Sequence, residues 1–163
     1  IRDLGARVGR VRESRELADR IEADIDAVRK RVAGRPRPRT LLVFGRDAET
    51  LRGIYASGGI GFLHDMLEAA GGENVFADVK RQSIQATSEL VITRAPDVIV
   101  EIGADTASSS GRNLGAWNTL ASVPAVRNRR IYLLTGDGMM NPGPRISESV
   151  RRMAEAIHPE AFK

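Results

Sequence analysis

Three short apolar runs in the C-terminal three quarters of the chain constrain its fold more than any other feature. They are residues 41–44 (LLVF), 97–102 (DVIVEI) and 131–134 (IYLL). Runs of four to six residues suit strands rather than helices, and continuous apolar runs are typical of strands that are buried on both faces. We therefore expect the three runs to lie in one buried, mostly parallel sheet.

Segments with helical spacing of apolar residues separate these runs. Residues 62–70 place apolar side chains on one helical face, and Gly71 and Gly72 end the segment as glycines commonly do at a helix C-terminus. Residues 87–94 and 116–122 are shorter segments of the same kind. Buried strands that alternate with helices predict an α/β fold, a three-layer Rossmann-like lobe with helices on both faces of the sheet.

The last helix is expected to open at Pro144, because proline is well tolerated at a first helical position. Its apolar face consists of Ile146, Val150, Met153 and Ile157. A weaker extended segment is expected at residues 75–76.

A long helix is expected before the lobe. Its apolar residues recur every three or four positions, at Leu17, Ile21, Ile25, Val28 and Val32. The helix should run over residues 13–33, roughly 30 Å at 1.5 Å per residue, and Gly34 and Pro36 should end it. Residues 1–9 are expected to form a short, weak helix. We therefore divide the chain into residues 1–34, the lone helix with what precedes it, and residues 35–163, the α/β lobe.

The charge pattern argues against nucleic-acid binding, although the net charge is +4. Basic residues of the long helix are interspersed with acidic ones, and the one dense stretch, residues 35–39 (RPRPR), has no aromatic residues for base stacking. The absence of cysteine excludes disulfides and thiolate metal sites.

The sequence contains no strong catalytic or metal-binding motif. Ligands of parallel α/β sheets bind at the carboxyl ends of the strands, which here lead into residues 45–61, 103–114 and 135–142. Residues 58–61 (GGIG) are neither a dinucleotide fingerprint nor a phosphate-binding loop. His64 and His158 lack the spacing of metal ligands. We predict no enzyme, no catalytic residue, no metal and no cofactor.

Several quoted segments together resemble one protein family. In order, they are FLHDMLEAAGGENVFAD, TSELVITRAPDVIVEIG, WNTLASVPAVRNRRIYLLTGDGMMNPGPRI and IHPE. The chain resembles the substrate-binding proteins of bacterial ABC importers for cobalamin, haem and ferric siderophores, over about residues 4–162. Within that family it resembles the C-terminal lobe and the helix that joins the two lobes.

The resemblance implies a two-lobed protein that holds a small-molecule ligand between its lobes and delivers it to a permease in the inner membrane. It also implies an exported protein on the periplasmic or extracellular face of the membrane, whose signal peptide is not in this chain. The N-terminal lobe is missing from this sequence, and residues 1–9 resemble its last piece.

The resemblance places the ligand against two of the strand-end loops. In TGDGMMNPGPRI, Met139 is expected to face the ligand or to tuck into the core, and Asp137 and Asn141 offer polar partners to the amides of a corrin ring. Asp137 is equally typical of a turn between glycines. Tyr55 packs against either the macrocycle or the core.

Two serines complete the predicted ligand-binding set, Ser57 beside Tyr55 and Ser83 further along the chain. The single tryptophan, Trp117, is expected to pack in the core.

Cobalamin is our first choice of ligand, because the PGPR turn with an aspartate upstream resembles the cobalamin-binding relatives most. Siderophore-binding relatives present basic residues to an anionic iron complex, and the loops here offer Arg46, Arg52 and Arg112. Haem-binding relatives need an axial tyrosine or histidine. A nucleotide-using enzyme, which needs a glycine-rich phosphate loop directly after Phe44, and an interaction module without a small ligand are the alternatives from other classes.

Glu89 in TSELVITRAPD resembles the glutamate with which this family docks to arginines of the permease. Thr87 or Ser88 can cap the short helix, which places Glu89 in its first turn, where the helix dipole favours a carboxylate. The other interpretation is a glutamate that only stabilises its helix.

Overall fold

The computed structural model describes residues 1–104 and 111–163 of the chain. The described helices are α1 (Arg2–Arg7), α2 (Val11–Val32), α3 (Phe62–Ala69), α4 (Ser88–Arg94), the 3₁₀ helix η1 (Leu114–Leu120), α6 (Pro124–Arg127), α7 (Asp137–Met140), α8 (Ile146–Ile157) and the 3₁₀ helix η2 (Pro159–Ala161). The described strands are β1 (Arg39–Gly45), β2 (Ile54–Ser57), β3 (Glu73–Asn74), β4 (Ser83–Ala86), β5 (Val98–Gly103) and β6 (Ile131–Thr135).

The three apolar runs of the sequence form the centre and one edge of a single sheet. Strand order is β4-β2-β1-β5-β6, with β3 pairing to β1 outside this path. Strands β1, β5 and β6 are mutually parallel, with Leu41 opposite Ile99 and Ile102 opposite Leu134. Every residue of β5 is buried, as expected for a central strand covered on both faces. The expectation of an α/β fold with a mostly parallel sheet is confirmed.

Two strands that the sequence did not predict extend the sheet on its other side. β2 pairs antiparallel with β1, and β4 pairs antiparallel with β2. Residues 45–61 are therefore not one long loop, because β2 lies within them. The short segments IYAS and SIQA lack a continuous apolar run, so local pattern alone did not mark them as strands.

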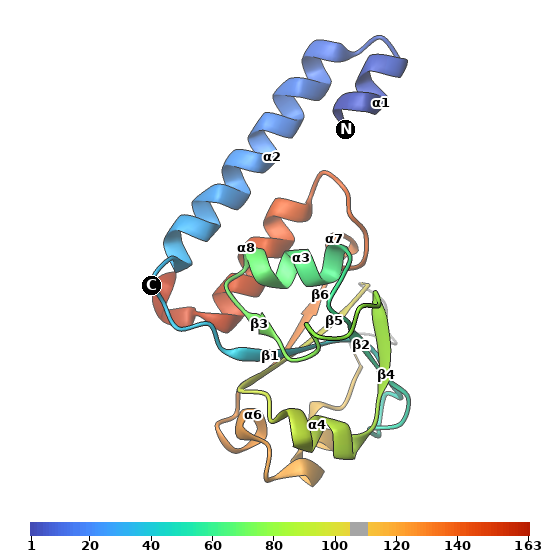
Figure 1. Cartoon of the computed structure of the whole chain (residues 1–163), viewed down its shortest axis with the longest axis vertical. Helices are drawn as coiled ribbons and strands as arrows, with labels where there is room; N and C mark the ends of the chain where they lie inside the picture. The colour runs from blue at the N-terminus through green and yellow to red at the C-terminus, as the bar shows by residue number, and fades with distance from the viewer. Residues whose placement is uncertain (105–110) are drawn as a thin grey trace.

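Two hydrophobic cores lie on opposite faces of the sheet. Leu42, Val100 and Ile102 contribute to the core under α2, α3 and α8. Leu41 and Ile99 point the other way and contribute to the core under α4, η1 and α6. Side chains that alternate along β1 and β5 therefore fill both cores, and the predicted three-layer arrangement is present (Figure 1).

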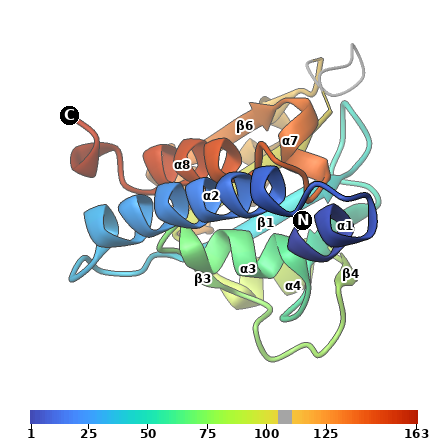
Figure 2. The same cartoon turned by 90° about the horizontal axis from the view of Figure 1, so that it is seen from above.

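The long helix predicted for residues 13–33 is α2. It packs on α8 and, to a smaller extent, on α3, and seen from above it lies over the helix layer (Figure 2). Its buried side chains recur at helical spacing and are Ser14, Ala18, Ile21, Val28 and Val32. The remaining faces of α2 are mostly exposed and charged. Of the described helices, none is long and apolar enough to cross a membrane.

Several details differ from expectation. The last helix begins at Ile146 rather than at Pro144, because residues 143–146 form a turn in which the Ile146 amide donates to the Gly143 carbonyl at 3.0 Å. The segment predicted at residues 116–122 is the 3₁₀ helix η1, two residues earlier. The predicted strand-end loop at residues 135–142 contains the one-turn helix α7. The weak extended segment expected at residues 75–76 is β3, at Glu73–Asn74.

Candidate functional site

An irregularity in β1 shapes the surface at the carboxyl ends of the strands. Val43 is opposite Ala56, whereas Gly45 is opposite Tyr55, so Phe44 is the extra residue of a bulge. The Phe44 and Tyr55 rings lie 6.3 Å apart between centroids at 34°. Tyr55 is 45% exposed, so its ring forms surface at this edge. Tyr55 is thus not buried in the core, although its ring lies beside Phe44 at the edge of the core, and its contact with a ligand stays a prediction.

A close approach of two chain segments brings β4 to this surface. A Cβ atom on Gly58 would lie 2.1 Å from the Arg81 carbonyl oxygen, and one on Gly59 would lie 2.1 Å from that of Ala77. Only glycine therefore allows residues 77–82 to run against residues 58–59. The consequence is that Ser83, at the start of β4, is exposed next to this turn.

A cavity of about 260 Å³ lies where these segments meet the first turn of α3. Its lining residues are Phe44, Ile60, Gly61, Phe62, Leu63, Gln82 and Ser83. None of these side chains is charged, and Ile60 is 43% exposed. Together with Tyr55, they form what we call the neutral wall. The structure thus brings Tyr55 and Ser83, two of the predicted ligand-binding residues, to one surface.

Two other predicted ligand-binding residues are not on the surface. Ser57 is fully buried, and its hydroxyl donates to the Gly58 carbonyl at 3.0 Å, because β2 is covered by the turn that follows it. Met139 is also fully buried in the core under α8. Between the two expectations for Met139, the structure supports the one in which it tucks into the core, since α7 presses its side chain against α8.

Two further residues of the α7 segment are less buried than Met139. Met140 is half-buried at the edge of the same core, and Asn141 is exposed. Asp137 is the first residue of α7, and its side chain lies outside what the structure describes. A role in ligand binding for Asp137 and Asn141 stays a prediction.

Behind the neutral wall, a carboxylate is buried in the sheet. Glu101 of β5 is 0% exposed. Its Oε1 accepts hydrogen bonds from Arg46 Nε at 2.8 Å and Trp117 Nε1 at 2.6 Å, and Arg112 Nη1 lies 3.4 Å from its Oε2. We call Glu101, Arg46, Arg112 and Trp117 the buried charge cluster. Trp117 is fully buried, as the sequence predicted.

Arg46 ties the loop after β1 into a fixed shape. Its Nη1 donates to the carbonyls of Asp47, Ala48 and Thr50 at 2.7 to 3.2 Å, and its Nη2 donates to the Asn113 carbonyl at 3.0 Å. Its guanidinium also lies 5.8 Å from the ring centroid of Trp117. The loop after β1 is therefore filled by a side chain, whereas a phosphate-binding loop would present its backbone amides to a ligand.

Sequence reasoning treated Arg46 and Arg112 only as candidates for an anionic ligand, and it missed Glu101. The side chains of Arg46 and Arg112 are 0% and 9% exposed and are turned toward Glu101, so they do not serve that purpose in this structure. Arg52 is exposed. The missed signal was a glutamate inside an apolar run, because a buried carboxylate needs a cationic or donor partner.

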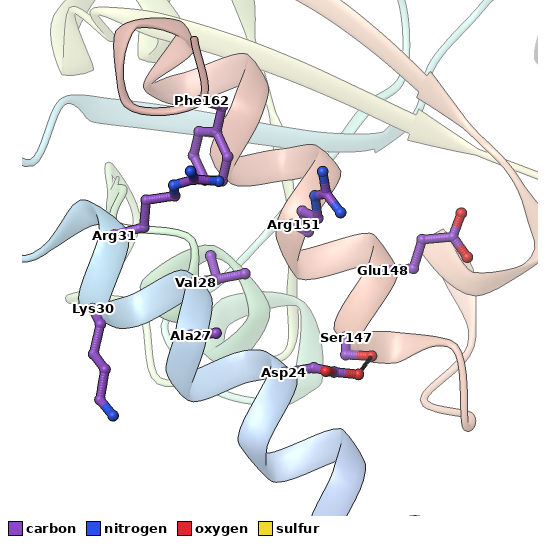
Figure 3. Close-up of a pocket in the computed structure, with 9 residues that line it drawn as sticks. All are labelled: Asp24, Ala27, Val28, Lys30, Arg31, Ser147, Glu148, Arg151 and Phe162. Carbon is purple, nitrogen blue, oxygen red and sulfur yellow. Dashed lines mark hydrogen bonds between the residues drawn. The ribbon is translucent and has the colours of Figure 1, made fainter.

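A larger cavity, of about 690 Å³, lies between α2 and α8 rather than at the strand ends (Figure 3). The Asp24 carboxylate accepts from the Ser147 hydroxyl at 3.4 Å at one end, and the Arg31 guanidinium lies over the Phe162 ring at the other. Lys30 points away from the groove (Figure 3). Its polar groups are thus engaged with one another or turned to solvent, and we do not assign the ligand to it.

Helix α4 lies on the other side of the sheet from α2 and α8 (Figure 1). Thr87 caps it, accepting a hydrogen bond from the Leu90 amide at 3.3 Å, and Glu89 is exposed in the first turn. Hydrogen bonds from its own amide and from the Thr87 hydroxyl hold the pKa of the Glu89 carboxyl below its usual value of 4.5. Glu89 is therefore an ionised, oriented carboxylate on the outer surface.

The chain is similar in sequence to known binding proteins. A profile of the family described as periplasmic binding protein matches residues 1–137. A cobalamin-binding protein of Halobacterium salinarum is 31% identical over 147 residues, which cover 88% of this chain and 37% of that relative.

Two solved structures add to this comparison. An ABC-type Fe³⁺-hydroxamate transport system protein of Saccharomonospora viridis superposes with a TM-score of 0.81 at 26% identity, over 95% of this chain and 52% of that one. A periplasmic haem-binding protein of Roseiflexus sp. RS-1 superposes with a TM-score of 0.75 at 26% identity, over 98% of this chain and 61% of that one. The chain thus spans little more than a third of the curated relative and about half to three fifths of these structures.

Proposed function

The chain belongs to the periplasmic binding protein family, and from this premise we propose that it is the ligand-binding lobe of a substrate-binding protein that serves an ABC importer. The family expected from the sequence is thereby confirmed. The similarity extends over nearly the whole chain and includes α2 together with the carboxyl ends of the strands. In this proposal the ligand rests on the neutral wall and is covered by a second lobe of the same protein.

We propose cobalamin or a related corrinoid as the ligand. The observation that carries this choice is the uncharged lining of the neutral wall, with Tyr55 exposed beside it and both nearby arginines turned inward to Glu101. A corrin ring has an apolar face and a rim of neutral amides, which match aromatic contact and serine or amide partners. The similarity to the cobalamin-binding protein of H. salinarum supports the same ligand.

The alternative within the family is haem or a ferric siderophore, in keeping with the two solved relatives. Haem carries two carboxylates and ferric tricatecholates are anionic, so both would favour cationic side chains on the wall, whereas a ferric trihydroxamate is neutral and is not distinguished by this charge argument. The inward orientation of Arg46 and Arg112 favours the corrinoid over these anionic chelates.

Calorimetric titration of the protein at its full natural length tests the ligand. Cyanocobalamin should bind saturably with a stoichiometry of one, and haem and a ferric tricatecholate should bind at least about tenfold more weakly, a difference of about 1.4 kcal/mol. Tight binding of haem or the siderophore with no binding of cyanocobalamin would move the assignment to the alternative.

The proposed macromolecular partner is an ABC permease in the membrane, which Glu89 contacts. An ionised carboxylate held on a capped helix suits a bidentate arginine of a partner, and Glu89 has this geometry on the outer surface of the lobe. The proposed location is the outer face of the cytoplasmic membrane, in the periplasm or facing the exterior. The solved haem-binding relative is described as periplasmic, which supports this location.

A further inference from the structure

The buried charge cluster holds more positive than negative charge, and it touches the neutral wall at Phe44. Glu101 contributes one carboxylate, and Arg46 and Arg112 contribute two guanidiniums. Arg112 Nη2 lies 3.5 Å from the carbonyl oxygen of Phe44, whose side chain lines the wall. Arg112 therefore lies in contact with the backbone of a residue that lines the wall, and none of the residues that line the cavity is charged.

Stability alone gives a weak reason for this arrangement. A buried ion pair is often no more stabilising than well-packed apolar residues of similar volume, because desolvation offsets the attraction of the charges. The cluster does fix the shape of the loop after β1 and ties it to Asn113, through the carbonyl contacts of Arg46. Glu101 also turns the guanidiniums of Arg46 and Arg112 toward itself. Their direction determines whether a bound ligand meets a positive charge.

The two arginines are held unequally. Arg46 is 0% exposed, hydrogen-bonded to Glu101 at 2.8 Å and to four carbonyl oxygens, and close to the Trp117 ring. Arg112 is 9% exposed, and its contacts with Glu101, Ile102 and Phe44 are longer, at 3.4, 3.1 and 3.5 Å. If the carboxylate were lost, Arg112 would therefore be the first to leave the cluster.

We propose that Glu101 is a positioning residue that sets the charge preference of the ligand site. It holds Arg46 and Arg112 inside the cluster, so that neither guanidinium meets a ligand on the wall, which favours a macrocycle with a neutral rim over an anionic chelate. The inference rests on the proposed function, because it assumes that the ligand lies on this wall.

The variant Glu101→Gln tests the role of the carboxylate with little change of shape. The carbonyl oxygen of the new glutamine can accept a hydrogen bond from Arg46 or Trp117. Its NH₂ group is a donor and cannot accept a hydrogen bond from Arg112, which is also a donor. Arg46 and Arg112 then repel each other without a carboxylate between them. Arg112 should turn out to the wall and meet the ligand.

Two corrinoid ligands of nearly the same shape but different charge separate the effect of ligand charge from that of ligand shape. The probes are cyanocobalamin and its monocarboxylate derivatives, in which one peripheral amide is hydrolysed to an acid. The readout is the ratio of the two affinities in the full-length protein, measured by calorimetry. In Glu101→Gln we expect this ratio to shift toward the monocarboxylates by about tenfold for the isomer whose acid lies nearest Arg112, as for a charge-assisted contact. An unchanged ratio would overturn the proposal.

Two control variants separate positioning from general structural damage. Glu101→Asp keeps the charge and should keep the wild-type ratio. The double variant Glu101→Gln with Arg112→Gln lacks the released cation and should return the ratio to the wild-type value. A cluster that only supports the fold would instead weaken both probes equally in Glu101→Gln, and such a result would contradict the proposal.

The single variant Arg112→Gln gives a test that does not depend on whether Glu101→Gln folds. It leaves the bonds of Arg46 and Trp117 to Glu101 in place. Because Arg112 is turned away from the wall, its loss should leave the ratio within about twofold of wild type. A selective fall in monocarboxylate affinity would mean that Arg112 already faces the ligand and would refute the inference. If the wild-type protein binds neither probe, the proposed function itself fails.

Discussion

The neutral wall and the buried charge cluster lie next to each other at the same edge of the sheet, yet they reverse the usual placement of side chains. Tyr55 and Ile60 are 45% and 43% exposed on the wall, whereas Arg46 and Glu101 behind it are 0% exposed. Large apolar groups are ordinarily buried and charges ordinarily solvated. Such a reversal in one small region is typical of a surface that meets a ligand rather than water.

The two regions also have different roles: the charge cluster supports the structure, and the neutral wall, in our proposal, contacts the ligand. The charge cluster joins β5 to Arg46 and Asn113, whereas Tyr55 and Ser83 of the wall are positioned by the pairing of β2 with β4. A ligand that is large and flat loses less entropy on binding when the surface is preorganised. Substitutions in the cluster should therefore change stability as well as ligand preference, and substitutions on the wall should change affinity with little effect on stability.

The largest expected effect is the loss of the buried carboxylate. Glu101→Ala leaves Arg46 buried without a counter-charge and should lower the free energy of unfolding by about 3–5 kcal/mol, as measured by urea denaturation. Tyr55→Ala is the comparison on the wall and should lower it by less than about 1 kcal/mol. Equal losses in the two variants would remove the distinction between the regions.

Glu89 lies outside the neutral wall and the buried charge cluster, so its substitution should affect neither ligand affinity nor the stability that the cluster provides. Glu89→Ala should weaken complex formation with the permease, because it removes one partner of the proposed interfacial ion pair, and should leave ligand affinity unchanged. Glu148→Ala is the matched control, because Glu148 is also an exposed glutamate in the first turn of a helix. Docking at wild-type strength by the Glu89 variant would refute the assignment.

The same contact has a defined pH dependence. The lowered pKa of Glu89 keeps its carboxylate ionised at pH values where an ordinary glutamate begins to protonate. The contribution of Glu89 is therefore fully present above its usual pKa of 4.5 and is lost only as the pH falls through its lower value in the folded protein. The part of docking that depends on Glu89, measured as the difference between wild type and Glu89→Ala, should decline at a lower pH than an ordinary glutamate would give, and a decline of this part that begins above 4.5 would contradict the orientation by Thr87.

On the wall, Tyr55→Ala should weaken cyanocobalamin binding by about 2 kcal/mol, the value of an aromatic anchor in an interface. Ile92→Ala is the matched control, because Ile92 on α4 is 43% exposed and lies away from the wall. Titration calorimetry on both variants measures the difference. An equal effect of the two substitutions would mean that Tyr55 has no direct contact with the ligand.

A smaller effect is expected from the segment after β6. Asp137→Ala should weaken corrinoid binding by about 1–2 kcal/mol, the value of a hydrogen bond to a charged acceptor. The test is calorimetry on this variant and on the double variant with Asn141→Ala. Unchanged affinity in the double variant would mean that this segment is not part of the site.

The sequence predicted the strands and helices whose burial leaves a regular pattern of apolar residues. The apolar runs of β1, β5 and β6 and the helical spacing of α2 and α8 were sufficient, because burial on both faces or on one stripe leaves a period in the sequence. β2 and β4 were missed because their pairing depends on the Gly58–Gly59 turn and on contacts between distant segments. The start of the last helix was misplaced because proline was assigned to its first position.

The candidate site was predictable in outline only. The strand-end loops followed from the parallel sheet, and exposure of Tyr55, Ser83 and Asn141 agrees with their predicted place. The burial of Ser57 and Met139 was not readable from the sequence, since small and flexible side chains suit a core as well as a cleft. Glu101 was the available signal for the charge cluster, as a carboxylate within DVIVEIG.

The most direct test of the account is a crystal structure of the full-length protein with cyanocobalamin bound. The account predicts the corrin ring against Tyr55 and Ile60 on the neutral wall, with Arg46 and Arg112 still turned to Glu101. A corrin ring bound in the groove between α2 and α8, or one whose polar groups contact Arg112 directly, would contradict it.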